Sequence, residues 1–304
     1  PFIVKPAEAT PLSCITLVGI LREAGLPNPW GQVIHCDHDV AEQMVADERI
    51  AFFSFIGSSR VGWHLRSKLA AGAHCTLEHG GAAPVIVTDN SDWEAAIPML
   101  LKGGLYHAGQ VCVSVQRIFA HTSIARSLAE KMAESARQFK VGPAVDETTD
   151  IGPLIRPSEV QRVHQWVSEA RERGGELLCG GQPVSETCYP ATILYNPPSQ
   201  CNISQKEVFG PVIAIYSYSD FDEAIERANH PDFAFQSAIF TRDLDLAFQA
   251  ADRLTAKTVL INEHTAFRVD WMPFGGFKKS GLGTGGIGYT LKDMMIEKMI
   301  VIRH

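Results

Sequence analysis

Three features are missing from this 304-residue sequence, and each absence excludes a class of protein. No apolar run approaches the ~20 residues that cross a bilayer, so no transmembrane helix is predicted. The seven cysteines are odd in number and none forms a Cys-x-x-Cys pair, which argues against a disulfide scaffold and a zinc cluster. Basic residues are in deficit: 27 Lys and Arg against 34 Asp and Glu give a net charge of −7, without the positive surface that binds nucleic acid.

What remains is ordinary for a globular protein. Apolar residues make up 45% and charged residues 20%, which excludes disorder, and the length suggests about two domains. No signal peptide precedes the cysteines, so we expect a reducing, cytoplasmic compartment. The sequence opens on Pro1 without an initiator Met, and Phe2-Ile3-Val4 is typical of a buried strand, so we expect it to begin inside a domain.

Strand and helix signals alternate along the chain, which predicts an α/β fold with a parallel sheet covered by helices on both faces. The apolar run 299–302 predicts a final strand that pairs with another sheet or subunit. The predicted strands are 2–4, 32–36, 50–56, 75–78, 84–87, 117–120, 191–195, 212–217, 238–240 and 258–261, and the helices are 11–24, 39–47, 61–71, 92–105, 124–139, 158–173, 221–229 and 244–254.

Two residues could carry chemistry. Cys112 follows Gly109-Gln110-Val111 at a helix-to-strand junction, where a substrate can reach a thiol and the backbone N–H can face an oxyanion. Glu78 ends an apolar strand before Gly80 and Gly81, where desolvation raises a carboxyl pKa and suits it to general-base work. Taken alone, Cys112 could be an inert core thiol and Glu78 a strand-end salt-bridge partner.

Other segments could hold a nucleotide. Gly57 and Ser58 follow a strand and open a helix, whose free N–H groups attract phosphate. Lys5 and Glu8 follow the first strand, where a doubly wound sheet has its ligand crevice, and could hold ribose hydroxyls. Alternatively, Gly57 and Ser58 form a simple turn, and Lys5 and Glu8 lie at a solvated helix start.

Two aromatic-glycine loops complete the set. In Glu207-Val208-Phe209-Gly210-Pro211, Phe209 could press against a flat ring while Glu207 accepts from a hydroxyl. The loop that begins at Phe274 could line a tunnel to the reactive atom. Either loop could instead be an ordinary turn, since glycine and proline are the residues that turns favour.

In order and spacing, these segments resemble the NAD(P)-dependent aldehyde dehydrogenase superfamily over essentially the whole chain. The resemblance implies a partial Rossmann-like nucleotide-binding domain, an α/β catalytic domain and a short C-terminal strand. We expect the C-terminal part of an NAD-binding domain over 1–79, the catalytic domain over 80–285 and an oligomerisation tail over 286–304. The N-terminal part of the family's chain is absent, and with it an Asn that completes the oxyanion hole.

The resemblance also implies a reaction. Cys112 would attack an aldehyde, hydride would pass to the nicotinamide, and Glu78 would activate water to hydrolyse the thioester. Lys5, Glu8, Gly57, Ser58, Glu207 and Phe209 would bind the cofactor. Because Glu8 would repel a 2′-phosphate, NAD is favoured and NADP remains possible. No metal is expected, and the partners are a small aldehyde and further copies of the chain in a homodimer or homotetramer, without nucleic acid or membrane.

Substrate identity and catalytic competence stay open. Arg268 could receive a carboxylate, phosphate or hydroxylated aldehyde beside Phe274, or it could form a structural pair with Asp270. A thiol hydrolase that uses Cys112 and His107 is one alternative. A catalytically incomplete fragment that acts only as a binding or assembly module is another. His79, where the family commonly has an apolar residue, has no explanation at this stage.

Overall fold

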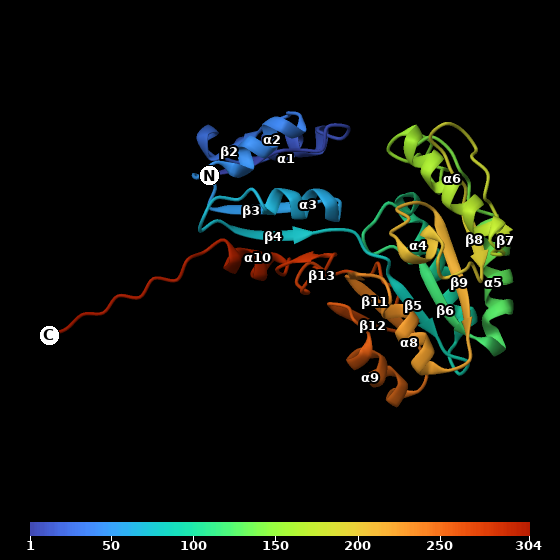
Figure 1. Cartoon of the computed structure of the whole chain (residues 1–304). Coiled ribbons are helices and arrows are strands. Elements are labelled where there is room, and N and C mark those ends of the chain that lie inside the picture. Colours follow the sequence, from blue (N-terminus) through green and yellow to red (C-terminus); the bar gives the residue numbers. More distant parts are fainter. The chain divides into compact units, whose positions relative to one another are not determined.

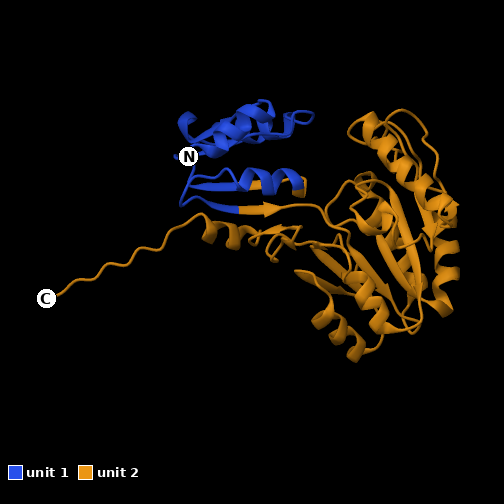
Figure 2. Cartoon of the chain, in the orientation of Figure 1, with its two compact units in different colours: residues 1–53, 60–75 blue, residues 54–59, 76–304 orange.

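The structure, a computed structural model, describes residues 1–304 and divides them into two compact units (Figures 1 and 2). Unit 1 comprises residues 1–53 and 60–75, and unit 2 comprises residues 54–59 and 76–304. Three elements contain residues of both units: β3 (Phe52–Ile56), α3 (Ser59–Arg66) and β4 (His74–Glu78).

Unit 1 is built on a strand–helix–strand motif. Strands β1 (Phe2–Val4) and β2 (Gly31–Val33) pair in parallel. In the sequence they are connected by α1 (Leu12–Glu23) and the 3-10 turn η1 (Asn28–Trp30). α1 ends because Gly25, with a φ of 103°, turns the chain and lets Leu26 N–H donate to Leu21 O. Asp37 begins α2 (His38–Ala46) by accepting a hydrogen bond from Val40 N–H.

Unit 2 is built on a seven-stranded sheet in the order β12-β11-β5-β6-β9-β8-β7. All neighbouring strands are parallel except β7, which runs antiparallel to β8 at one edge. The strands are β5 (Pro84–Val87), β6 (Arg117–His121), β7 (Glu176–Cys179), β8 (Thr192–Tyr195), β9 (Val212–Tyr218), β11 (Gln236–Phe240) and β12 (Thr258–Ile261).

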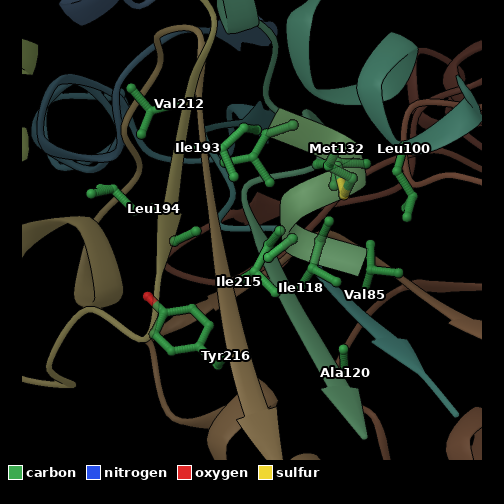
Figure 3. Packing of buried hydrophobic residues seen from close by; sticks show 14 of the residues in the cluster. Val85, Leu100, Ile118, Ala120, Met132, Ile193, Leu194, Val212, Ile215 and Tyr216 are labelled. Carbon is green, nitrogen blue, oxygen red and sulfur yellow. The ribbon is translucent and has the colours of Figure 1, made fainter. Parts of the chain in front are cut away.

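Helices cover both faces of this sheet. Successive side chains of a strand point to opposite faces, so each central strand contacts helices on both sides. In β6, Arg117 and Phe119 face α8 (Phe221–Asn229): the Arg117 guanidinium donates to carbonyls near the end of α8, and Arg227 lies over the Phe119 ring. Ile118 and Ala120 alternate with them and share a buried cluster with Met132 of α5 (Thr122–Ala136) (Figure 3). The predicted α/β architecture is therefore confirmed.

The remaining elements of unit 2 are shorter or lie outside the sheet. They are α4 (Trp93–Leu105), the 3-10 turn η2 (Tyr106–Gly109), α6 (Pro157–Glu172), α7 (Asn202–Gln205), β10 (Phe233–Ala234), α9 (Leu244–Arg253), β13 (Phe277–Lys278), β14 (Gly281–Leu282) and α10 (Ile287–Asp293). β14 pairs with β4, and β13 with β10. None of the helices combines the length and the hydrophobicity that crossing a bilayer requires.

The structure departs from the predicted elements mainly where pairing is non-local. The strand expected over 299–302 does not form: residues 295–304 have no regular structure, since a lone strand has no partner for its hydrogen bonds. The helix expected over 61–71 stops at Arg66, and β7, β10, β13, β14, α7 and α10 were not predicted.

Candidate active site

Cys112, Glu207 and the two glycines that follow Glu78 lie on loops that lead into the amino ends of the central strands. Gly80 and Gly81 precede β5, Cys112 precedes β6, and Glu207 precedes β9. Because β5, β6 and β9 are adjacent and parallel, these loops emerge at one edge of the sheet.

A left-handed turn delivers Cys112 to this edge. After α4, His107, Ala108 and Gly109 all have positive φ, at 52°, 55° and 69°. Two consecutive non-glycine residues in this region cost roughly 1 kcal/mol or more each, so surrounding contacts must hold them. Gln110 supplies such contacts: its side chain donates to Pro153 O (3.3 Å) and accepts from Ile155 N–H (3.0 Å).

Cys112 is surrounded by negative charge. Its side chain is partly buried, and burial followed by the charges of Glu207 and Glu78 raises the pKa of the thiol to about 12. Its own backbone N–H and Arg268 act in the opposite direction. The resting thiol is therefore protonated at neutral pH. His107 is solvent-exposed and is not among the groups that shift this pKa.

Glu78 ends β4 opposite Gly281 of β14. Burial raises the pKa of its carboxyl, while the charges of Arg268 and, to a lesser extent, Lys257 lower it. A Cβ on Gly285 would overlap Glu78 Oε1, so the carboxylate packs against this glycine. Glu78 is therefore a partly desolvated carboxyl on which the charges of two cations, Arg268 and Lys257, act.

Glu207 packs against the glycines that follow Glu78. Gly81 N–H donates to Glu207 Oε1 (3.1 Å), and a Cβ on Gly80 would overlap the carboxylate. Burial raises the pKa of Glu207 to about 7, against the opposing effects of the Gly81 hydrogen bond and Arg162. A Cβ on Gly81 would lie 2.5 Å from Cys112 O, so the loop that bears Cys112 packs against the same segment.

Aromatic side chains flank these carboxylates. Phe209 has a φ of 47° and its side chain is 41% exposed, which leaves the ring free to meet a ligand. Phe274 is buried against Phe235, with ring centroids 4.9 Å apart. The Arg268 guanidinium lies over the Phe274 ring, 4.3 Å from its centroid, and no ion pair joins Arg268 to Asp270.

A family model described as "Aldehyde dehydrogenase family" matches residues 1–300. The chain belongs to the aldehyde dehydrogenase family.

Similar proteins include a 3-sulfolactaldehyde dehydrogenase of Priestia aryabhattai, which is 39% identical over 301 residues, 99% of this chain and 63% of that protein. Among solved structures, aldehyde dehydrogenase 21 of Physcomitrella patens in complex with the reaction product succinate matches with a TM-score of 0.95 and 35% identity, covering 100% of this chain and 63% of that one. The glyceraldehyde-3-phosphate dehydrogenase GapN of Methanocaldococcus jannaschii, complexed with NADP, matches with a TM-score of 0.91 and 35% identity, covering 96% and 64%. The chain thus spans less than two thirds of these relatives' length.

The other candidate residues of this aldehyde dehydrogenase chain are divided between the units. Gly57 and Ser58 lie in unit 2, where Gly57 N–H donates to Glu78 O (3.1 Å). Lys5 and Glu8 lie in unit 1 and form an ion pair at 3.5 Å, and His38 lies 3.6 Å from the same Glu8 oxygen. No group of three His, Cys, Asp or Glu side chains is arranged to hold a metal ion.

His79 has a structural explanation. Its side chain is 1% exposed, and burial lowers the pKa of the imidazole, which is therefore neutral. Since a carbonyl can only accept, Nδ1 carries the proton that bonds to Lys279 O (2.9 Å). Ser280 adds a second clamp: its hydroxyl donates to Gly80 O (2.8 Å) and accepts from Ala234 N–H (2.9 Å). Both residues hold the segment between Glu78 and Gly81.

Lys257 and Gln116 were not predicted from the sequence as parts of this environment, whereas Ser280 lies in the loop that contains Phe274. Lys257 donates to Gly283 O, and its charge acts on Glu78. No motif marks the residue, because it comes from the turn before β12, far along the chain from Glu78. Gln116 follows Cys112 by four residues, and its contacts depend on a loop 90 residues away.

Proposed function

We propose that the protein oxidises an aldehyde to a carboxylic acid with NAD or NADP as hydride acceptor. The observation that carries this proposal is the convergence of two carboxylates on a thiol: the charges of Glu78 and Glu207 both act on Cys112, and Glu207 accepts from Gly81 N–H, three residues after Glu78. Family membership and the printed activities of the relatives support the reaction type.

Cys112 Sγ bonds to the aldehyde carbon, and the carbonyl oxygen takes the thiol proton to give a thiohemiacetal. A bound nicotinamide would supply the hydride acceptor; once the carbon attached to Cys112 has lost its hydride and the oxygen its proton, a thioester would remain on Cys112. Glu78 then removes a proton from water as the hydroxide adds to the acyl carbon, and the thiolate leaves and is reprotonated. A carboxyl whose pKa is raised by burial suits this base role.

The residues of unit 2 fit a nicotinamide ribose and ring. Within the protein, the Glu207 carboxylate accepts a hydrogen bond only from Gly81 N–H, so lone pairs remain for ribose hydroxyls. Phe209, on the same loop, offers an exposed ring for stacking. Gly57 and Ser58 lead into the start of α3 and would take phosphate. In unit 1, Lys5 and Glu8 would hold the adenine ribose, with the Glu8 charge favouring NAD.

Arg268 points to an anionic aldehyde. Its guanidinium is exposed, acts on both Cys112 and Glu78, and is not paired with Asp270. A sulfonate or carboxylate on the substrate would find a bidentate partner there, next to Phe274. The names of two relatives, a 3-sulfolactaldehyde dehydrogenase and an enzyme crystallised with succinate, support this class.

The decisive experiment mixes the chain with NAD or NADP and a panel of anionic and neutral aldehydes while reduced nicotinamide is monitored. We expect turnover that Cys112→Ser abolishes, and Glu78→Gln to trap a thioester visible as an added acyl mass. Nucleotide-independent ester hydrolysis that survives Glu78→Gln would instead support the Cys112–His107 hydrolase. No turnover with an intact fold would support the binding or assembly module.

The proposal extends to assembly and compartment. Exposed apolar residues in the tail, among them Ile296, Met299 and Ile300, support a homodimer or homotetramer in which the tail pairs with another copy. The seven free cysteines fit a reducing cytoplasm. A mass measurement in solution tests the first statement.

A further inference from the structure

Gln116 connects the nucleophile segment with the loop that bears Glu207. The residue lies four positions after Cys112, and its side chain is buried, at 4% exposure. Its backbone is fixed on both sides, because its N–H donates to Ala83 O (3.5 Å) and its carbonyl accepts from Ala214 N–H (2.9 Å). The side chain therefore starts from a rigid point at the centre of the sheet.

The Gln116 amide brackets Glu207. Its Nε2 donates to Lys206 O (2.7 Å) and to Ile203 O (3.2 Å), and its Oε1 accepts from Val208 N–H (2.9 Å). Lys206 O and Val208 N–H are the backbone groups on either side of Glu207. One planar amide that bonds both of them fixes the backbone at Glu207 much as a neighbouring strand would.

We propose that Gln116 is a positioning residue that holds Glu207 and Phe209 ready for the nicotinamide ribose. This inference rests on the proposed function, because it assigns a purpose to a clamp on the cofactor loop. A glutamine is suited to the task, since its amide donates and accepts at once without adding charge beside Glu207.

A second side chain, that of Arg162, binds the same part of the loop as Gln116. Arg162 Nη2 donates to Val208 O (2.7 Å), so both backbone groups of Val208 are bound by side chains. Phe209, immediately after, is held at a φ of 47°, which a non-glycine residue adopts only under constraint. Loss of the Gln116 amide would let Glu207 and Phe209 relax together while Cys112 stays in place.

The test compares Gln116→Met, which keeps the length of the side chain but forms none of these hydrogen bonds, with the unaltered chain. Gln205→Met is the matched control: Gln205 is the last residue of α7, two positions before Glu207, but its side chain is exposed and bonds only Ser199 O. Hydrogen exchange of the peptide that contains Val208 is measured by mass spectrometry, and NAD affinity by calorimetry. We expect Gln116→Met to speed exchange at Val208 and to weaken NAD binding by about tenfold or more, and Gln205→Met to change neither.

Steady-state kinetics separates positioning from general damage. The KM for NAD should rise about tenfold in Gln116→Met, while the kcat at saturating NAD stays within about twofold. If Gln116→Met fails to fold, Gln116→Asn takes its place, because it keeps an uncharged amide that is one methylene too short to reach both Lys206 O and Val208 N–H; its NAD affinity should be intermediate. Unchanged exchange and unchanged affinity in the folded variant would overturn the proposal. If the unaltered chain binds no NAD, the proposed function fails. Faster hydrogen exchange at Val208 in Gln116→Met would then still show that the Gln116 amide holds this loop.

Discussion

The charge of Glu207 should control the reactivity of Cys112. Burial and two carboxylates raise the thiol pKa to about 12, and Glu207 is the larger of the two electrostatic causes. At pH 8, four units below that pKa, roughly one thiol in ten thousand is ionised. Replacing Glu207 by Gln keeps the shape of the side chain and removes its charge. Because a like charge nearby shifts a pKa by about one unit or more, the variant should hold about tenfold more thiolate.

The pH dependence gives this prediction a sharper form. The pKa of Glu207 itself is about 7, so its carboxyl is largely neutral below pH 6 and charged above pH 8. A neutral carboxyl does not repel the thiolate. Glu207→Gln and the unaltered chain should therefore react alike near pH 6, whereas above pH 8 the variant should react about tenfold faster.

The assay is the alkylation rate of Cys112 with iodoacetamide, read by mass spectrometry on the peptide that contains it, since the chain has six other free cysteines. Cys112→Ser identifies the signal. Glu226→Gln serves as control, because this helix carboxylate is not among the groups that act on the thiol. Identical rates for Glu207→Gln and the unaltered chain above pH 8 would refute the electrostatic argument.

Three further predictions follow from the same contacts. Lys257→Met should raise the pKa of Glu78 further, because it removes a positive charge that lowers this pKa; the acid limb of the pH–rate profile for thioester hydrolysis should then move to higher pH. Lys257→Arg keeps the charge and should leave the acid limb where it is in the unaltered chain. Superimposed pH–rate profiles for all three chains would contradict this role of Lys257. Arg268→Ala should lower kcat/KM for anionic aldehydes by about 10- to 100-fold and leave neutral ones nearly unchanged, and equal losses for both would remove the substrate role. Glu8→Gln should improve the NADP to NAD ratio of kcat/KM by about tenfold, and an unaltered ratio would dissociate Glu8 from cofactor choice.

The regular elements were largely predictable because their signals are local. Asp37, Asp220 and Asp243 cap helices α2, α8 and α9 within a residue or two of the expected starts, each by accepting from backbone N–H groups of the first turn. β7 was missed because a four-residue edge strand is defined by its partner rather than by its own sequence. The tail at 299–302 was expected as a strand and has none, for the same reason.

Residues of the candidate site were proposed from the sequence, but which of them lie close together was not. General rules for doubly wound sheets place ligands at the carboxyl ends of the strands, whereas Cys112 and Glu207 precede β6 and β9 at their amino ends. The positive φ of His107 and Ala108 was equally hidden, because non-glycine residues seldom adopt it and two in succession are rarer still. Cys112 and Glu207 were singled out by their local sequence, and the family's motif order connected them to one reaction.

The glycines of the motifs show what sequence reasoning lacked. From the sequence, Gly80 follows a carboxylate expected to be desolvated and Gly109 precedes a thiol expected to be accessible, and neither pattern names the loop that each glycine meets. In the structure a side chain on Gly80 would overlap the Glu207 carboxylate, and one on Gly109 would overlap the backbone of Gly210. Each glycine is thus a point where two loops touch, and the touching loop in both cases is the one that bears Glu207. These contacts explain how a carboxylate 95 residues after Cys112 comes to raise the pKa of its thiol: the glycines leave no atoms between the loops, so little solvent remains to screen the charge.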